Sequence, residues 1–306
     1  MKWLAAFLLA VVMIAPGCKK QEQPNGKLQV VTTLFPLYDF AKRIGGDKAQ
    51  VTLLLPPGVE PHSFEPRPED IVRVNRAALF IYTNAVMEPW AAGIVAGVEK
   101  GKVDIVEGSK GIPLLPAPEA DGHEAAHEHE QGGRDPHVWL DLDNARLMAG
   151  NILAAMIARD PGNKAYYEQN AAGLTRDLAA LDQRYRETLA NSPKKVFLHG
   201  GHYAFGYLAR RYGLRYVSAS AVNADAEPTP SRLAELVKLM RRERLGYVYT
   251  EELLSPRVAE TIARETGAKV LMLRAGHNLT RDEFERGVSF ISLMEENLRN
   301  LKTGLQ

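Results

Sequence analysis

Cysteine is nearly absent from this sequence, since Cys18 is the only one in 306 residues and no intrachain disulfide can form. Net charge is lacking as well. Residues 1–17 hold one lysine and no acidic residue, and the chain that follows has 37 basic and 37 acidic residues. This balance argues against a nucleic-acid-binding surface and against a polybasic membrane face. The sequence also lacks a glycine-rich phosphate loop, which argues against a nucleotide-dependent enzyme.

The first 17 residues have the anatomy of an export signal. A positive start at Lys2 precedes the apolar run Trp3–Ile14, which is too short to span a bilayer as a stable anchor. Cys18 follows a small residue, at the place where a lipoprotein signal peptidase would cut. We therefore expect a lipoprotein signal peptide at 1–17, a flexible tether at 18–27, and an extracytoplasmic lipoprotein, periplasmic or on the cell surface, anchored to the membrane at Cys18. The alternative is a soluble export signal with an incidental cysteine.

Short apolar runs alternate with helical patterns along most of the remaining chain, which predicts two α/β lobes with parallel sheets. We expect an N-terminal lobe at 28–163, a long linking helix at 164–191, where Ala, Leu, Glu, Gln and Arg dominate, and a C-terminal lobe at 192–306. The strands are expected at 28–33, 49–55, 78–82, 102–106, 195–199, 215–218, 247–250 and 269–273. The other helices are expected near 37–44, 68–77, 89–98, 144–159, 204–212, 231–242, 257–266 and 281–301. Residues 113–133 are rich in Pro, Ala, Glu, His and Gly without apolar periodicity, which predicts a mobile loop.

Three histidines stand in turns beside the predicted strands and helices. His62 follows the strand ending LLLPPG, His137 lies in DPHVWLD before a long helix, and His202 follows the strand KVFL and opens a helix. These are the rims where ligand sites form in open α/β sheets. Three imidazoles from separate turns suit a tetrahedral zinc ion. A lone loop histidine is more often a surface or hydrogen-bonding residue, so the metal site requires that the three come together.

Acidic residues close to these histidines have two interpretations. Glu65, Asp135 and Asp141 could accept hydrogen bonds from imidazole N–H groups and so orient the rings. They could equally cap helices, and Asp141 stands near a predicted helix start. His199, at the end of an apolar strand, is expected to be buried near the site rather than to bind metal.

Five segments resemble, in order, those of the solute-binding proteins of zinc and manganese ABC transporters: PHSFEP, DPHVWLD, HYAFGYLARRYGL, AEPTPSRLAELV and SPRVAETIARETGAKVLML. The resemblance covers nearly all of residues 28–301. It implies two α/β lobes joined by one long rigid helix, with metal in the cleft between them and His62, His137 and His202 as ligands. It also implies that the chain captures Zn²⁺ for a membrane permease with its ATPase, as a monomer and not as an enzyme.

The same resemblance bears on the choice of metal. In the manganese branch the third ligand is typically a carboxylate, so His202 favours Zn²⁺ over Mn²⁺. Zinc-specific members also resemble this chain in carrying a His- and acid-rich insertion before the second ligand. This implies that His123, His127 and His129 hold additional metal weakly, and a solvated charged linker is the alternative.

The fourth ligand departs from the family pattern. The family places an aspartate in a segment similar to LDPLG, whereas this chain reads LRAGHN, and Arg274 in that place cannot bind a cation. Water, Glu251 after the strand YVYT, and His277 in the altered loop remain candidates. We favour His277, because Glu251 could instead be engaged by Arg211 or Arg274.

Three other functions are compatible with these residues. The chain could be a manganese- or iron-binding member of the same family, or an adhesin or scavenging lipoprotein without a transporter. It could also be a zinc-dependent hydrolase, because three histidines and an open position describe a catalytic zinc site. In the favoured interpretation, metal bridges the lobes and shifts them toward an arrangement that the permease recognises, and the long helix keeps this motion small.

Overall fold

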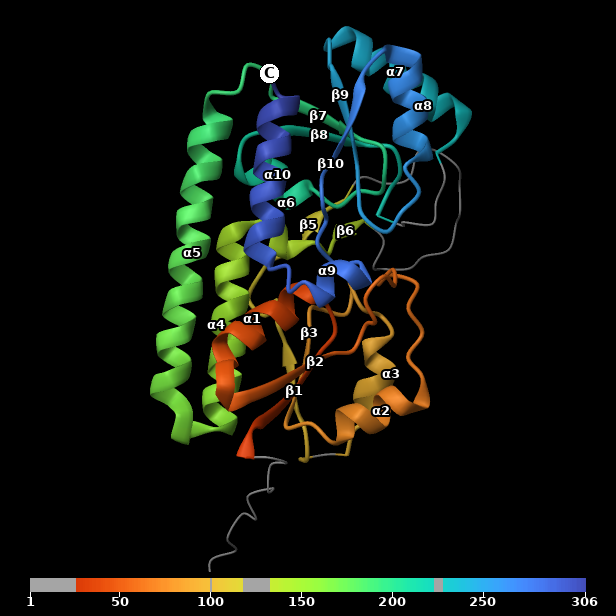
Figure 1. Cartoon of the computed structure of the whole chain (residues 1–306). Coiled ribbons are helices and arrows are strands. Elements are labelled where there is room, and N and C mark those ends of the chain that lie inside the picture. The colour runs from red at the N-terminus through yellow and green to blue at the C-terminus, as the bar shows by residue number, and fades with distance from the viewer. Residues whose placement is uncertain (1–25, 100, 118–132, 223–227) are drawn as a thin grey trace, which may run out of the picture.

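The computed structural model describes residues 26–99, 101–117, 133–222 and 228–306. Figure 1 shows two lobes, each built on a four-stranded parallel sheet, and one long helix that runs beside both. The strand order is β2-β1-β3-β4 in the first sheet and β10-β9-β7-β8 in the second. Counted within its own lobe, each sheet therefore has the order 2-1-3-4. The predicted fold class is confirmed.

The first lobe contains β1 (Leu28–Thr32), α1 (Phe35–Gly45), β2 (Ala49–Leu53), α2 (Pro68–Asn75), β3 (Leu79–Tyr82), α3 (Ala91–Ala96) and β4 (Asp104–Glu107). It is followed by β5 (Leu115–Pro116), β6 (Arg134–Asp135), the short 3-10 turn η3 (Val138–Leu140), α4 (Leu142–Arg159) and α5 (Lys164–Ala190). The second lobe contains β7 (Val196–His199), α6 (Gly206–Arg211), β8 (Arg215–Ser218), α7 (Pro230–Arg242), β9 (Tyr247–Thr250), α8 (Arg257–Thr266), β10 (Lys269–Met272), α9 (Arg281–Glu285) and α10 (Phe290–Gly304).

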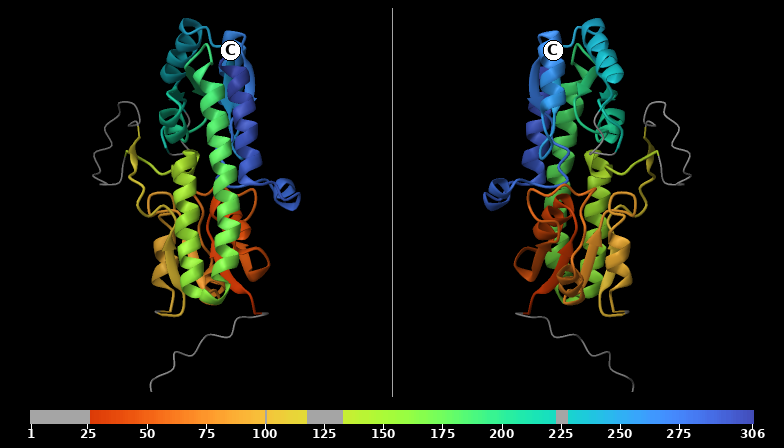
Figure 2. Two further views of the ribbon diagram at one scale, coloured as in Figure 1. Left: turned by 90° about the vertical axis from the view of Figure 1, so that its left-hand side faces the viewer. Right: turned by 90° about the vertical axis from the view of Figure 1, so that its right-hand side faces the viewer.

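The helix α5 has the amphipathic spacing expected of a helix with one buried face. Its buried side chains recur every three or four residues from Tyr167 to Leu189. This face packs against α1 and α4 toward one end of the molecule and against α10 toward the other end, as the turned views in Figure 2 show. The largest cluster of buried apolar side chains accordingly continues from the first sheet to the second. The two lobes share this main cluster, and each lobe also has a smaller separate cluster of its own.

Two local features differ from the sequence-based prediction. The single helix expected at 281–301 is two helices, because Gly287 has a left-handed φ of 70° after α9, a conformation that glycine adopts without strain. Ser289 then caps α10 by accepting from the backbone N–H of Ser292. The short strand β5 lies inside the range 113–133 that was predicted to be a loop, and it pairs antiparallel with the short strand β6 just after that range. With two residues each, they show no periodicity that sequence analysis can detect.

No helix in the described ranges is both long enough and apolar enough to cross a membrane. Cys18 and the residues around it lie outside those ranges.

Candidate metal centre

Four histidines come together where the loops of the two lobes meet. His62 lies between β2 and α2, His137 two residues after β6, His202 between β7 and α6, and His277 between β10 and α9. The order of the second sheet reverses between β7 and β9. Loops at the carboxyl ends of such a pair of strands diverge and leave a crevice in which ligands bind. The loop after β7 places His202 at this point.

The four imidazole rings form a nearly regular tetrahedron. Their six pairwise centroid distances all lie between 5.0 and 5.6 Å. One nitrogen of each ring lies within 4.8 Å of the corresponding nitrogens of the other three. Three rings are buried and His62 is partly buried. Four inward-facing donors in this arrangement match the coordination that zinc prefers.

The distance between two of the ring nitrogens indicates what the centre can hold. The Nε2 atoms of His137 and His202 are 3.3 Å apart. Nδ1 of His137 lies 2.8 Å from Asp135 Oδ1, and Nδ1 of His202 lies 2.9 Å from Glu251 Oε1. Because a carboxylate accepts hydrogen bonds, Nδ1 carries the proton in both rings and each Nε2 directs a lone pair inward. Two nitrogens bound to one tetrahedral zinc ion, at about 2.0–2.1 Å each, are about 3.3–3.4 Å apart.

The other two rings also direct unsatisfied nitrogens into the protein. Nε2 of His62 and Nε2 of His277 are buried, and neither has a hydrogen-bond partner among the described residues. Buried polar atoms nearly always have a partner. Nitrogens without one, in a group of four, fit a set of metal donors.

Burial keeps three of the imidazoles neutral. Burial, reinforced by the neighbouring histidines, lowers the pKa of His62 to about 3 and holds the pKa values of His137 and His277 well below the ordinary value. For His202, burial also lowers the pKa, but the charge and hydrogen bond of Glu251 outweigh it, and the net pKa is raised. In the metal-free protein, His202 is therefore the ring of the four that a proton occupies most readily.

The same two carboxylates hold the main chain beside the rings. Asp135 Oδ1 accepts from the backbone N–H of His137 at 3.0 Å, and Glu251 Oε1 accepts from the backbone N–H of His202 at 3.1 Å. Each carboxylate thus fixes the ring and the backbone of one histidine together. These two contacts of Asp135 are the geometry expected of a residue that orients the His137 ring.

The loop that carries His277 belongs to the second lobe in sequence, but it is hydrogen-bonded to residues of the first lobe. The carbonyl of His277 accepts from the backbone N–H of Phe35 at 2.9 Å. The side-chain amide of Asn278 donates to the carbonyls of Pro56 and Val59 at 2.7 and 2.9 Å. Because residues 56–59 lead into the turn of His62, these bonds place His277 against that turn.

Two residues that sequence analysis did not single out hold this loop from the other side. Glu252 accepts from the backbone N–H groups of Ala275 and Gly276. Trp139, two residues after His137, donates from Nε1 to the carbonyl of Ala275 at 2.8 Å. The only sequence signals for them were an acidic residue directly beside Glu251 and a tryptophan within DPHVWLD.

Glu251 is not one of the four converging donors, since its carboxylate is hydrogen-bonded to His202. Neither arginine considered as its partner pairs with it. Arg211 binds a group of aspartates, namely Asp141, Asp143 and Asp182. Arg274 binds Glu283 and Glu296.

The remaining predicted residues have other surroundings. Asp141 caps α4, as its second interpretation had it, by accepting from the backbone N–H of Asp143. Glu65 is exposed. His199 is buried and its Nδ1 accepts from the backbone N–H of Gly201. Thr280 caps α9 by accepting from the backbone N–H of Glu283. His123, His127 and His129 lie outside the described residues.

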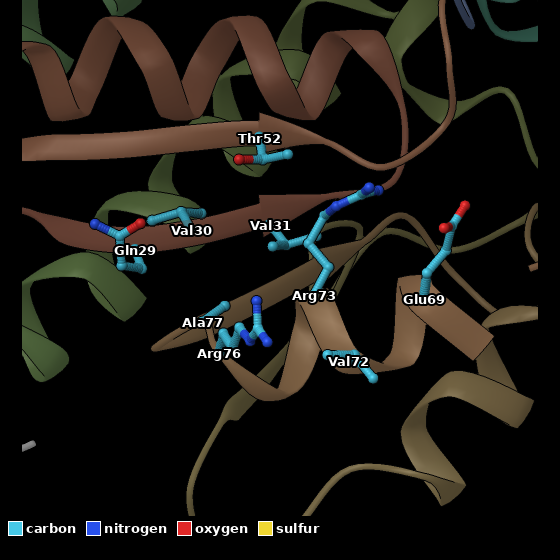
Figure 3. A pocket seen from close by; sticks show the side chains of 9 residues that line it. All are labelled: Gln29, Val30, Val31, Thr52, Glu69, Val72, Arg73, Arg76 and Ala77. Carbon is cyan, nitrogen blue, oxygen red and sulfur yellow. The ribbon is translucent and has the colours of Figure 1, made fainter. Parts of the chain in front are cut away.

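A pocket on the outer face of the first sheet contains none of the histidines. Figure 3 shows its lining, which comes from β1, β2 and α2, with Arg73 and Arg76 extending in different directions. Its polar side chains do not converge on one point, so the histidine centre is the stronger candidate for function.

Comparison with known sequences finds relatives over nearly the whole chain. Residues 30–304 match the protein family described as zinc-uptake complex component A, periplasmic. The chain is 38% identical to the high-affinity zinc uptake system protein ZnuA of Bacillus subtilis, over 99% of this chain and 98% of that protein. It is also 38% identical to the zinc-binding lipoprotein AdcA of Streptococcus pneumoniae over 98% of this chain. It spans 60% of the length of that lipoprotein.

Solved structures share the fold over nearly the whole described chain. The Zn(II)-bound ZnuA-like domain of Streptococcus pneumoniae AdcA superposes with a TM-score of 0.78 at 36% identity, covering 92% of this chain and 99% of that domain. The metal-dependent lipoprotein YcdH of Bacillus subtilis superposes with a TM-score of 0.79 at 39% identity, covering 92% of this chain and all of YcdH.

Proposed function

Because this chain belongs to the family of the zinc-uptake complex component A proteins, we propose that it captures one Zn²⁺ ion outside the cytoplasm and delivers it to a membrane permease with its ATPase. The proposed ligands are His62, His137, His202 and His277. The observation that carries the proposal is the tetrahedron of four imidazoles with inward-facing nitrogens. Four nitrogen donors favour Zn²⁺ over Mn²⁺, which prefers carboxylate, carbonyl and water oxygens.

The proposal extends to parts of the chain outside the histidine centre. Cleavage after residue 17 would leave Cys18 as an acylated N-terminus, with residues 18–27 as the tether. This anchor is supported by the AdcA relative of Streptococcus pneumoniae, which is named as a zinc-binding lipoprotein. His123, His127 and His129 would hold further zinc weakly. The lobes at 28–163 and 192–306 would act as one monomeric unit linked by 164–191.

A zinc-dependent hydrolase is the second candidate. Residues 123–127 read HEAAH, which matches the HExxH pattern of zinc peptidases. That pattern holds zinc when it lies on a helix, and here it lies in a segment rich in Gly, Glu and Ala that the structure does not describe. In the histidine centre, four imidazoles fill a tetrahedral set and leave no open position for a substrate. We therefore propose a binding protein and not an enzyme.

Native mass spectrometry after metal competition tests the main proposal. We expect the soluble chain, offered equal Zn²⁺ and Mn²⁺ with a competing chelator, to retain one zinc ion. Retention of manganese, or of no metal at all, would contradict the proposal. A chelator-sensitive peptidase activity of the zinc-loaded chain would favour the hydrolase instead.

The pH dependence of zinc binding follows from His202 and Asp135. The pKa of His202 is raised, and burial raises the pKa of Asp135 to about 7, so both groups are protonated at pH 6 in the metal-free protein. Zinc displaces the proton of His202 and stabilises ionised Asp135. We expect the release of between one and two protons at pH 6, and an affinity that falls by about one to two orders of magnitude from pH 6 to pH 5.

Calorimetric titrations in buffers of different ionisation enthalpy measure this release. The low pKa values of the other three rings mean that they add no protons in this range. Release of three or more protons at pH 6 would show that these rings are not held neutral.

A further inference from the structure

The two carboxylates beside the histidine centre each lie against a glycine. A Cβ atom on Gly201 would overlap Glu251 Oε1, and a Cβ atom on Gly206 would overlap Asp135 Oδ2. Neither glycine has a positive φ, so the backbone conformation does not require glycine at either position. What the two positions share is the space that a carboxylate occupies.

The two carboxylates can compensate the charge of a metal ion bound at the centre. Four neutral imidazoles leave the full charge of a bound divalent cation uncompensated, and an uncompensated buried charge is costly. Asp135 and Glu251 are both buried and each bonds to the Nδ1 side of one ring. Together they supply two negative charges, which neutralise the dication without occupying a coordination position. The same bonds aim the lone pairs of His137 and His202 inward.

We propose that Asp135 and Glu251 are positioning residues that set the zinc affinity of the centre, and that Gly201 and Gly206 are glycines because they leave room for those carboxylates. This inference rests on the proposed function. It predicts that affinity can be lost while all four donor histidines remain.

The substitution Gly201→Ala tests the inference most directly. We expect zinc affinity to fall at least about tenfold, the lower end of the range for losing a group that orients a metal ligand. Gly246→Ala is the matched control, because a Cβ at Gly246 meets nothing within 4 Å and the position has no positive φ. Affinity is measured by competition with a chromophoric chelator, and circular dichroism with thermal unfolding verifies the fold of each variant.

A second variant keeps the test valid if Gly201→Ala does not fold. Glu251→Gln preserves the size of the side chain and removes its charge, and we expect a loss of similar size. The cobalt-substituted variants should show altered d–d absorption, since a tilted imidazole distorts the tetrahedral field, whereas a purely structural role would leave this spectrum unchanged. In a Glu251→Ala background, Gly201→Ala should cost less than about twofold further, because the two changes remove the same contact.

The outcomes separate this inference from the proposed function. If the unaltered chain binds no zinc, the proposed function fails. If the unaltered chain binds zinc and both Gly201→Ala and Glu251→Gln bind it equally well, the function stands and the positioning role is wrong. Fully additive losses in the double variant would also contradict it, because they would show that Gly201 acts through something other than Glu251.

Discussion

Replacement of His137 by alanine is expected to weaken zinc binding at least about 100-fold. Removal of a group that only orients a metal ligand costs about 10- to 100-fold, and His137 is proposed as a ligand itself. Its ring is fully buried, and its Nε2 lies 3.3 Å from Nε2 of His202. The measurement is a zinc titration against a competing chelator at pH 7.5.

His127→Ala is the matched control for this substitution, because it makes the same chemical change outside the group of four. We expect tight binding in the control to equal that of the unaltered chain. A His137 variant that binds like the control would remove His137 from the centre.

His277→Ala extends the test to the fourth position. Loss of affinity in a Glu251 variant cannot identify Glu251 as a ligand, because its carboxylate orients His202. The number of imidazole nitrogens bound to the zinc ion can show whether His277 is the fourth ligand. We expect zinc X-ray absorption spectra to show four nitrogen donors in the unaltered chain and three in His277→Ala. An unchanged donor set would exclude His277.

Replacement of Arg211 by alanine is expected to lower the free energy of unfolding by about 3 kcal/mol. Arg211, on α6, donates to Asp182 on α5 at 2.6 and 2.7 Å and to Asp141 at the start of α4 at 2.7 Å. Only 7% of its side chain is exposed. Without Arg211, the partly buried carboxylates of Asp141 and Asp182 repel each other with no positive charge between them. The second lobe also loses the hydrogen bonds that connect α6 to α4 and α5.

The effect of Arg211 should depend on pH. Burial raises the pKa of Asp182, but hydrogen bonds from Arg211 and Tyr212 outweigh it and hold the pKa at about 2. A folded-state pKa below the ordinary value stabilises the fold above about pH 4, and this contribution is lost as pH falls toward 2. The difference between parent and variant should therefore shrink at low pH.

Arg210→Ala is the control for Arg211, because Arg210 is the preceding residue on α6 and is exposed. Urea unfolding should show a change within about 0.5 kcal/mol for this variant. An equal loss in both variants would indicate that α6 itself, rather than the ion-pair network, was disturbed.

Local patterns were sufficient to predict most of the fold and three of the histidines. Alternating apolar and helical periods predict strands and helices because each depends on its own residues and on burial of one face. His62, His137 and His202 were found because each adjoins a strand or helix whose end the sequence marks. For these features the structure follows the short-range signal closely.

His277 was favoured as the fourth ligand because the segment LRAGHN departs from the family pattern, but its place beside the other three rings could not be predicted in the same way. It depends on bonds such as those of Asn278 to Pro56 and Val59, and no local pattern records a partner so distant in sequence. The shared core and the break at Gly287 were missed for related reasons. Apolar residues of both lobes look alike in sequence, and a single glycine inside a helical pattern does not by itself predict where the chain turns.

The bonds that hold the His277 loop to the first lobe also have a consequence for the order of events during synthesis and export. Asn278 and Pro56 are separated by 222 positions in the chain, and contacts of such separation form late because a long loop must close first. A chain still emerging from a translocation channel presents at most three of the four histidines. Tight metal capture is therefore expected only after the last part of the polypeptide has arrived and closed onto the first.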